Sequence, residues 1–360
     1  MEKAQGGITT ETQPIFDVDK ARSMIAKGRR AKWWRRMGSK NRGFYYVDPN
    51  GSRVTDEQHL ERIKSLVLPP AWKHVYVAPS AGSRLQAVGM DTTGRVQYKY
   101  HPTFTARRQK QKFARIEEFG KHLPRLRQIT NEHIMLPGFP REKVLAVMIR
   151  LINSLYFRVG TEKSARHYRT YGITTLQNKH FRVERGCELV FDFVGKSHVQ
   201  HRKILVDEEL AAVMLEIKQL GRAGKLFHYL DEDGTPRPIK PHDINCYLKE
   251  VTAPEYSSKD FRTWGGTLLA AIRLAEIGCV EDERHTKKNL VRAIKGVAED
   301  LGNTVAVCRS SYIHPAVITA YQKGMTIDNF RPKKQRRIQR REAEYEPEEL
   351  ALMKLLSAEI

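Results

Sequence analysis

The stretch that decides the fold is REKVLAVMIRLINSLYFRVG, residues 141–160. Its apolar residues recur at helical spacing, and Gly160 stands where a helix commonly ends. We therefore predict a strongly apolar helix that closes at Gly160. Helical spacing also extends from about residue 103 to about residue 324, so most of this half of the chain is predicted to be helical.

One β-prone segment interrupts the helical half. In CELVFDFVGKSHVQHRKILV (187–206), Leu189, Phe191 and Phe193 alternate with polar residues, and a turn is predicted at 195–197. This pattern predicts a hairpin with Lys196 at its tip. The helices expected around it are 104–119, 121–135, 207–220, 240–252, 263–277, 286–300, 304–312 and 315–324.

The first hundred residues have a different pattern. GFYYVDPNGSRV (43–54) places hairpin-forming residues between two β-prone runs, and DEQHLERIKSL (56–66) has helical spacing. Further strands are expected at 74–78, 84–89 and 95–100. The predicted fold class is α+β, in which a small N-terminal antiparallel sheet with helices precedes a larger, mainly α-helical domain containing a short β-hairpin.

Changes in pattern and composition divide the chain into four predicted segments. These are a flexible N-terminus (1–20), a first domain (21–105), a second domain (106–328) and a tail that is first basic and then acidic (329–360). In the basic part, Arg331 to Arg341 holds seven Arg or Lys and no acid. It could add nonspecific contacts to a polyanion or be a solvated charge run.

The charge balance indicates the kind of partner. The chain has 63 Lys or Arg against 41 Asp or Glu, a net charge of +22 and a pI near 9.8. Such an excess opposes compaction unless a polyanion neutralises it, which favours nucleic acid over the alternative, an anionic membrane surface. No apolar run reaches about 18 residues and no signal-peptide core is present, so we expect a soluble, intracellular protein.

The cysteines do not suggest a metal site or a disulfide framework. Cys187, Cys246, Cys279 and Cys308 are scattered singly, without a C-x-x-C pair or a histidine at ligand spacing. Cys308 could be a nucleophile, but no base lies at readable spacing. Helix packing is the alternative for this residue.

CRSSYIHPAV (308–317) places Tyr312 among small polar residues. A phenol has a pKa near 10, so it is a poor nucleophile unless cations stabilise the phenolate and the transition state. On a basic surface that binds nucleic acid, the natural electrophile is a backbone phosphodiester. Arginine suits the non-bridging oxygens, because its guanidinium donates two hydrogen bonds in one plane.

Three cations are candidates for such a site, each with an ordinary alternative. Arg158 follows the apolar helix and could instead cap its C-terminus. Arg262, in KDFRTW, is expected at the entry to a helix, where an anion would be favourable, and could instead pair with Asp260. Lys196 could reach into a DNA groove from the hairpin tip or could simply be solvated. A lysine can also protonate a departing alkoxide.

Several motifs together resemble one family, the small type IB DNA topoisomerases of bacteria and poxviruses. The ordered set for the catalytic half is FRVGTEKSARHYRTYGITTLQNKHF (157–181), FVGK (193–196), KDFRTWGGTLLA (259–270) and LGNTVAVCRSSYIHP (301–315). In the N-terminal half, LPPAW (68–72), residues 89–91 and GRVQYKYHP (94–102) resemble the family's DNA-clamping cap. The resemblance covers roughly residues 25–325.

The resemblance implies a role for each matching residue. Tyr312 would be the nucleophile that forms a 3′-phosphotyrosyl bond, Arg158 and Arg262 would hold the scissile phosphate, and Lys196 would be the general acid. Asn303 stands where poxviral members have a histidine, and it can donate the same hydrogen bond but cannot carry a charge.

The resemblance also implies DNA contacts in the first domain. Gln97, Tyr98 and Tyr100 match residues that contact DNA, although an ordinary alternating strand would explain them equally well. KGRRAKWWRR (27–36) could be a DNA-touching arm, or an amphipathic element with core tryptophans.

The implied activity is relaxation of supercoiled duplex DNA without ATP, metal or another cofactor, by a monomer whose two lobes close round the duplex. A bacterial cytoplasmic, nucleoid-associated location goes with it. Two rivals remain open at this level. A tyrosine recombinase uses the same chemistry but typically has His-x-x-Arg at the second arginine, where this chain has Lys259 three residues before Arg262. A non-enzymatic DNA-binding protein would explain the charge alone.

Overall fold

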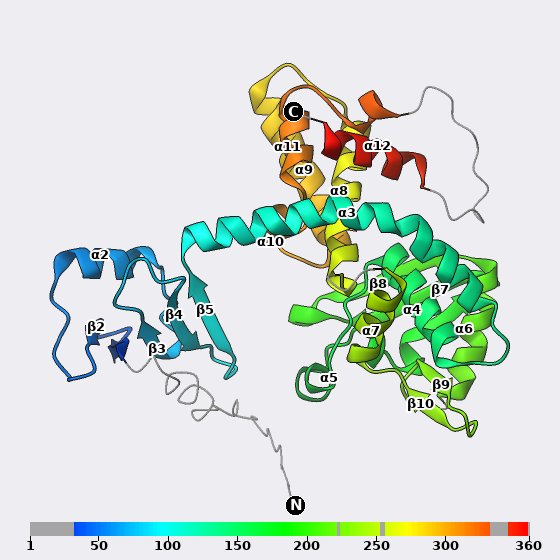
Figure 1. The fold of residues 1–360 in the computed structure, drawn as a ribbon, viewed down its shortest axis with the longest axis horizontal. Helices are drawn as coiled ribbons and strands as arrows, with labels where there is room; N and C mark the ends of the chain where they lie inside the picture. Colours follow the sequence, from blue (N-terminus) through cyan, green and yellow to red (C-terminus); the bar gives the residue numbers. More distant parts are fainter. Residues whose placement is uncertain (1–31, 222–223, 253–255, 332–344, 359–360) are drawn as a thin grey trace, which may run out of the picture. The chain divides into compact units, whose positions relative to one another are not determined.

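The computed structural model describes residues 32–221, 224–252, 256–331 and 345–358. The chain divides into two compact units, here called unit 1 (1–111) and unit 2 (112–360). Helix α3 (Pro102–Ile134) contains the boundary between them. Figure 1 labels the elements. The structure has an antiparallel N-terminal sheet followed by a mainly helical part with small sheets, which confirms the predicted α+β class.

Unit 1 is built on an antiparallel sheet with the strand order β2-β1-β3-β4-β5. Its elements are β1 (Trp34–Ser39), β2 (Gly43–Val47), α2 (Glu57–Ser65), β3 (Lys73–Val77), β4 (Leu85–Met90) and β5 (Val96–Tyr100). The carboxylate of Asp48 accepts the backbone N–H groups of Asn50 and Ser52, which closes the turn after β2. Strands β2 to β5 and helix α2 lie in the predicted segments. The hairpin predicted within 43–54 is wrong, because β2 pairs with β1 and the second run contributes only an isolated bridge between Val47 and Arg53.

The core of unit 1 includes part of the basic segment 27–36, which the sequence left open as a DNA-touching arm or an amphipathic element. Trp34 is 9% exposed and packs in this core with Tyr46, Ile63 and Val75. The guanidinium of Arg36 donates to the carbonyls of Pro69 and Trp72. These two residues are therefore structural parts of the sheet. Residues 27–31 of that segment, like the predicted flexible N-terminus, lie outside the described residues.

Unit 2 is mainly helical and contains two small sheets. Its helices are α4 (Arg141–Leu155), α5 (Glu162–Tyr168), α6 (Glu208–Leu220), α7 (Pro241–Val251), α8 (Ser258–Ile277), α9 (Glu283–Leu301), α10 (Val305–Ser311), α11 (Pro315–Gln322) and α12 (Pro347–Ser357). The strands are β6 (Phe181–Glu184), β7 (Glu188–Val194), β8 (Gln200–Val206), β9 (His228–Leu230) and β10 (Pro236–Pro238). β7 and β8 form the predicted hairpin, and β6 pairs with β7 to complete a three-stranded sheet.

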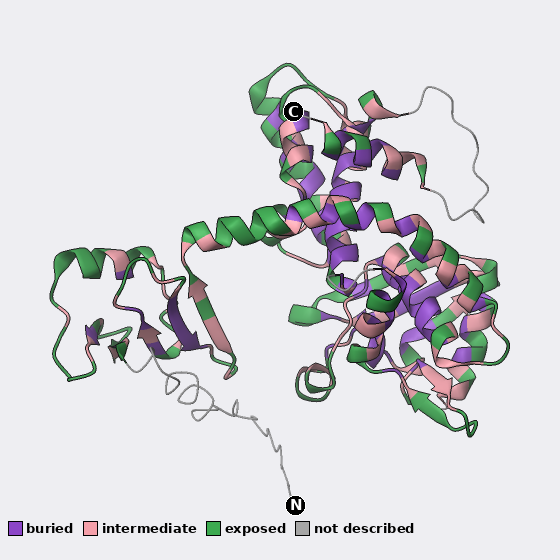
Figure 2. Ribbon diagram, in the orientation of Figure 1, coloured by how far each residue is buried: buried purple, intermediate pink, exposed green. Residues whose placement is uncertain are grey.

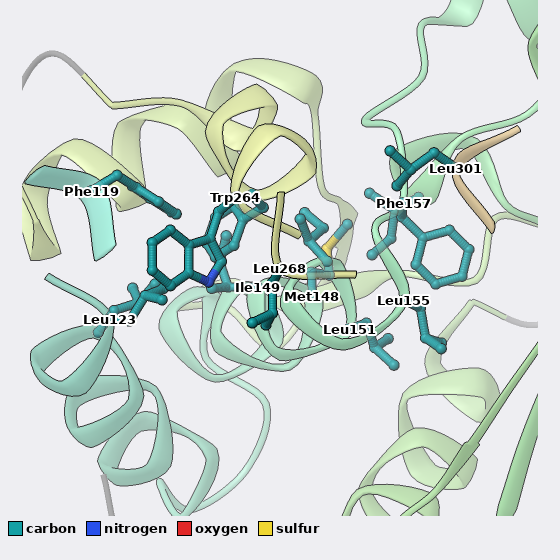
Figure 3. Close-up of a cluster of buried hydrophobic side chains, with 14 of the residues drawn as sticks. Phe119, Leu123, Met148, Ile149, Leu151, Leu155, Phe157, Trp264, Leu268 and Leu301 are labelled. Carbon is teal, nitrogen blue, oxygen red and sulfur yellow. The ribbon is translucent and has the colours of Figure 1, made fainter. Parts of the chain in front are cut away.

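Helix α4 lies at the centre of the unit 2 core, as its apolar sequence predicts. The buried residues gather along α4 and α8 (Figure 2). Figure 3 shows Trp264 of α8 beside Phe119 and Leu123 of α3, close to Ile149 of α4. No helix in the described parts of the chain combines the length and apolar character needed to cross a membrane.

The predicted end of α4 at Gly160 is wrong. The helix ends at Leu155, because Tyr156 adopts a left-handed conformation (φ 56°) and its N–H caps the helix on the carbonyl of Ile152. A glycine usually occupies such a position, so the sequence pattern pointed to the wrong residue. Residues 157–160 are thereby released from the helix to form a loop.

Two other helix boundaries differ from the prediction. α3 is one helix and not two, since it continues through Gly120 and Pro124. A methyl group at Gly120 would lie 2.5 Å from the Trp264 ring, so this glycine marks close packing and not a break. α8 begins at Ser258, five residues before the predicted start, because Ser257 and Asp260 form a capping box.

The C-terminal helix α12 packs into the core, a question that the sequence left open. The buried carboxylate of Glu349 accepts two hydrogen bonds from Arg127 of α3, at 2.8 and 2.7 Å. Leu352 and Leu355 are buried in the main hydrophobic cluster. The basic run at 332–341 lies outside the described residues.

Candidate active site

The C-terminal end of α9 organises the candidate site. The last carbonyls of a helix have no partner within it and carry the negative end of the helix dipole. Arg262 donates from Nη2 to the Leu301 carbonyl at 2.7 Å and from Nη1 to the Tyr156 carbonyl at 2.5 Å. This one guanidinium therefore joins the ends of α9 and α4.

Arg262 is deeply buried, with 5% of its surface exposed. It lies within α8 and not at the predicted helix entry, because the helix starts earlier. Burial lowers the pKa of Arg262, and the neighbouring Tyr312 phenol opposes this change. Asp260 is not its partner, since that carboxylate accepts from Arg115 at 2.7 Å and caps Ser257.

Arg158 lies in the loop that follows α4 and reaches the same end of α9. Its Nη2 donates to the Gly302 carbonyl at 2.9 Å and to the Oδ1 of Asn303 at 2.7 Å. The alternative role as a cap of α4 is wrong, since its side chain bonds the end of α9. Burial, together with the charge of Arg262, lowers the pKa of Arg158 to about 10. Two cations held close together in this way favour an anionic ligand.

Lys196 is an exposed residue in the turn η4 (Lys196–His198) between β7 and β8. Ser197 and His198 both have left-handed backbone conformations, with φ of 63° and 58°. The turn brings Lys196 to a small pocket that Arg158 and Arg262 also line. The lining residues of this pocket include four Lys or Arg side chains and no carboxylate.

Tyr312 directly follows α10 and lies beside Arg262. The guanidinium carbon of Arg262 is 5.3 Å from the centre of the phenol ring. The Tyr312 carbonyl accepts a hydrogen bond from the Thr267 hydroxyl of α8 at 3.2 Å, so the backbone of the phenol is fixed to the helix that carries Arg262.

Two glycines in α8 make this arrangement possible. A methyl group on Gly265 would lie 2.0 Å from the Tyr156 ring, and one on Gly266 would lie 2.8 Å from the Tyr312 carbonyl. Any side chain here would displace one of these tyrosines. The Trp-Gly-Gly sequence at 264–266 therefore lets both the α4 end and the Tyr312 segment approach α8.

Comparisons with known proteins show the family of this chain. The model of the eukaryotic DNA topoisomerase I catalytic core matches residues 101–341, and that of the bacterial DNA topoisomerase IB N-terminal domain matches residues 43–91. DNA topoisomerase 1B of Acanthamoeba polyphaga mimivirus is 32% identical over 287 residues, which cover 78% of this chain and 84% of the relative. The chain belongs to the type IB DNA topoisomerases.

More distant relatives carry the same name. DNA topoisomerase 1B of Vaccinia virus (strain Copenhagen) is 25% identical over 242 residues, covering 66% of this chain and 72% of the relative. DNA topoisomerase 1 of Daucus carota is 29% identical over 185 residues, or 51% of this chain and 20% of the relative. These matches confirm the family that the sequence motifs predicted.

Lys112 of α3 is a contact of Tyr312 that the sequence did not reveal. Its ammonium group donates to the carbonyl of Ser311 and lies 5.3 Å from the centre of the Tyr312 ring. Burial lowers the pKa of Lys112, with the charge of Asp260 opposing this. Because Lys112 lies in a lysine- and arginine-rich run, no sequence signal separates it from its neighbours.

The cysteines of this type IB topoisomerase are free thiols. Cys308 lies one turn before Tyr312 in α10 and is fully buried. Burial raises the pKa of its thiol to about 11, so the thiolate is rare at neutral pH. Its interpretation as a packing residue fits the structure, and the alternative as a nucleophile does not.

The three predicted DNA contacts of the type IB topoisomerase lie on β5 of unit 1. Tyr98 and Tyr100 are 40% and 44% exposed, and their rings stack at 6.1 Å. The Gln97 amide donates to Asp91 at 2.8 Å. Two exposed, stacked phenols are therefore available on β5 of unit 1.

Proposed function

We propose that this protein relaxes supercoiled duplex DNA by transient cleavage of one strand, with Tyr312 as the nucleophile. The observation that carries the proposal is the convergence of Arg158, Lys196 and Arg262 on one pocket without a carboxylate, with Tyr312 held against Arg262. This arrangement suits an anionic, pentacoordinate phosphorus.

Each group has a place in the reaction. The Tyr312 phenol loses its proton to solvent as its oxygen bonds to phosphorus. The bond from phosphorus to the 5′ oxygen breaks, and Lys196 donates a proton to the departing oxygen. Arg158 and Arg262 stabilise the added negative charge. The product is a 3′-phosphotyrosyl bond and a free 5′ hydroxyl.

Religation is the reverse transfer. The 5′ end swivels about the intact strand, and its hydroxyl then attacks the phosphotyrosyl bond. One phosphodiester replaces another of similar energy, so supercoil strain drives relaxation and the reaction requires neither ATP nor a metal.

Asn303 donates to a non-bridging oxygen in this proposal. Its Oδ1 accepts from Arg158, and its Nδ2 is buried without a hydrogen-bond partner among the described residues. A buried amide donor without a partner is costly, and a phosphate oxygen would satisfy it. A neutral amide stabilises the transition state less than a protonated histidine would.

The remaining parts of the proposal concern the whole protein. Residues 21–105 act as a cap in which Gln97, Tyr98 and Tyr100 contact DNA, and residues 106–328 form the catalytic domain. The protein acts as a monomer on the DNA of the cytoplasmic nucleoid. The support is the exposed phenol pair on β5 and the presence of every proposed catalytic group within one chain.

The test uses supercoiled plasmid in EDTA without ATP. Relaxed topoisomers are expected with the wild type, and mass spectrometry of a stalled reaction should detect an oligonucleotide on Tyr312. The Tyr312→Phe variant should bind DNA but neither relax nor cleave it. An unchanged plasmid with the wild type, or relaxation by Tyr312→Phe, would overturn the proposal, and binding without relaxation would favour a non-enzymatic DNA-binding protein.

A further inference from the structure

Lys203 is a partly buried cation in the candidate site to which the reaction above assigns no role. It lies on β8, and its side chain lines the same pocket as Arg158, Lys196 and Arg262. Its Nζ donates to the carbonyl of Asp300 at 3.1 Å.

Like the two arginines, Lys203 donates to a backbone carbonyl at the C-terminal end of α9. The carbonyls of three consecutive residues at the end of α9, Asp300, Leu301 and Gly302, accept from Lys203, Arg262 and Arg158 respectively. The three cations come from β8, α8 and the loop after α4. All three therefore surround the same helix end and face the same pocket.

Among the described residues Lys203 forms no ion pair, although the charge of Asp300 favours its ammonium form. The Asp300 side chain points to Arg273 instead, with which it forms an ion pair at 2.7 Å. A partly buried ammonium beside two guanidinium groups is unfavourable unless an anion joins them. The proposed scissile phosphate is such an anion.

We propose that Lys203 is a third phosphate-binding cation of the site, acting with Arg158 and Arg262 on the scissile phosphate. The inference rests on the proposed function of the pocket. In this inference the β7–β8 hairpin contributes two cations: Lys203 on strand β8 binds the phosphate, and Lys196 at the tip is the general acid.

Proton binding should report this role. Burial, with Arg262 and Arg158 nearby, lowers the pKa of Lys203 to about 8 in the free protein. A phosphate in the pocket would favour the ammonium form, so DNA binding near pH 8 should take up a proton. Of the other groups that line the pocket, His201 has a pKa of about 4 and Arg158 has a pKa of about 10, so neither changes its protonation near pH 8. Asp300 faces Lys203 from α9, and its carboxylate is ion-paired with Arg273.

The first experiment measures proton uptake by calorimetry at about pH 8, in buffers with different ionisation enthalpies. The protein is Tyr312→Phe, which binds DNA without cleaving it. A buffer-dependent heat that corresponds to uptake is expected, and it should disappear when Lys203→Met is added. Absence of uptake by the Tyr312→Phe protein, or uptake that persists with Lys203→Met, would overturn the inference.

The second experiment compares cleavage rates of Lys203→Met, Lys203→Arg and the wild type under single-turnover conditions. Loss of one donor to a developing oxyanion costs about 10²-fold, so Lys203→Met should cleave that much more slowly. Lys203→Arg should keep most of the rate. The wild-type rate is expected to decline above about pH 8 at subsaturating DNA, and Lys203→Arg should lose this decline.

Lys218→Met is the matched control. Lys218 is also a partly buried lysine that donates to a carbonyl, that of Phe181 at 2.8 Å, but it lies outside the pocket. It should cleave at the wild-type rate. If Lys203→Met also cleaves at that rate while Tyr312→Phe is inactive, the inference about Lys203 fails and the proposed function stands. Relaxation by Tyr312→Phe would instead remove the proposed function itself.

Discussion

His201 shows how a single residue can stabilise the site without taking part in the chemistry. It is 8% exposed, stacks on Phe193 at 5.2 Å, and its ring fills the space beside the backbones of Gly195 and Gly302. These glycines flank Lys196 and Asn303. The ring therefore lies between the hairpin and the end of α9.

The charge state of His201 predicts a loss of stability in acid. Burial, with Lys203 and Arg158 nearby, lowers its pKa from 6.5 to about 4. Between these two values the unfolded chain binds more protons than the folded chain, so the free energy of unfolding should fall as the pH falls from about 6.5 to about 4.

Urea unfolding at about pH 7 and pH 5 measures this effect. His180, His228 and His314 also have lowered pKa values, so the wild type alone cannot isolate His201. The His201→Phe variant should lose less stability between the two pH values than the wild type does. Equal losses would show that His201 is not buried in its neutral form.

Helix α8 is the element on which the site depends most. It carries Arg262, holds the Tyr312 carbonyl through Thr267, and accommodates Tyr156 at Gly265. Its early start at Ser258 places Arg262 inside the core, where a guanidinium reaches two helix ends at once.

Gly265→Ala is predicted to weaken both stability and activity. The added methyl group overlaps the Tyr156 ring, and the Tyr156 carbonyl accepts from Arg262. Overpacking of this kind costs about 1–3 kcal/mol, and plasmid relaxation should slow because Arg262 moves. Gly296→Ala in α9 is the control, since the atoms nearest to its methyl group belong to the end of the Arg273 side chain and not to a ring or backbone. Equal effects of the two substitutions would contradict this role of Gly265.

Helix α12 is fixed by the buried ion pair between Glu349 and Arg127. Arg127→Met should destabilise unit 2 by about 3–5 kcal/mol, because it leaves a buried carboxylate without its cation. Arg127→Met combined with Glu349→Leu should recover much of this loss. Urea unfolding of the single and double variants measures the coupling, and strictly additive effects would argue against the pair.

At the scale of the whole molecule, charge dominates. The net charge of +22 opposes compaction of the free protein and attracts a polyanion from a distance. Many Arg and Lys side chains of the described residues are exposed, so the excess positive charge lies at the surface where a polyanion can reach it.

DNA binding and relaxation should therefore fall steeply with salt. A protein that contacts 6–10 phosphates loses about 10³- to 10⁵-fold in affinity between about 50 and about 200 mM salt. Titration of a labelled duplex at several KCl concentrations, with plasmid relaxation measured alongside, gives the slope. An affinity that is indifferent to salt over this range would contradict a mainly electrostatic interface.

Much of the fold was predictable because its signals are local. Alternation in 187–206 predicts the hairpin, and helical spacing predicts α6, α7, α9 and α11 close to their observed bounds. The errors occur where tertiary contacts override the local pattern. Tyr156 ends α4 in place of Gly160, and Gly120 marks packing against Trp264 where a helix break was expected.

The candidate site was predicted in part. Composition and motif order selected Arg158, Lys196, Arg262 and Tyr312, and the structure places the first three on one pocket with Tyr312 beside Arg262. Lys112 and Lys203 were missed, because a lysine in a strongly basic chain carries no signal until its neighbours are known.

By itself, the sequence determined the α+β class, the type and order of most elements and the family, because periodicity, turn residues and ordered motifs are properties of neighbours along the chain. Only the tertiary structure decided which groups share the site. Arg158 meets Gly302 across 144 positions and Arg262 meets Tyr156 across 106, and both contacts exist because packing brings the ends of α4 and α9 to α8.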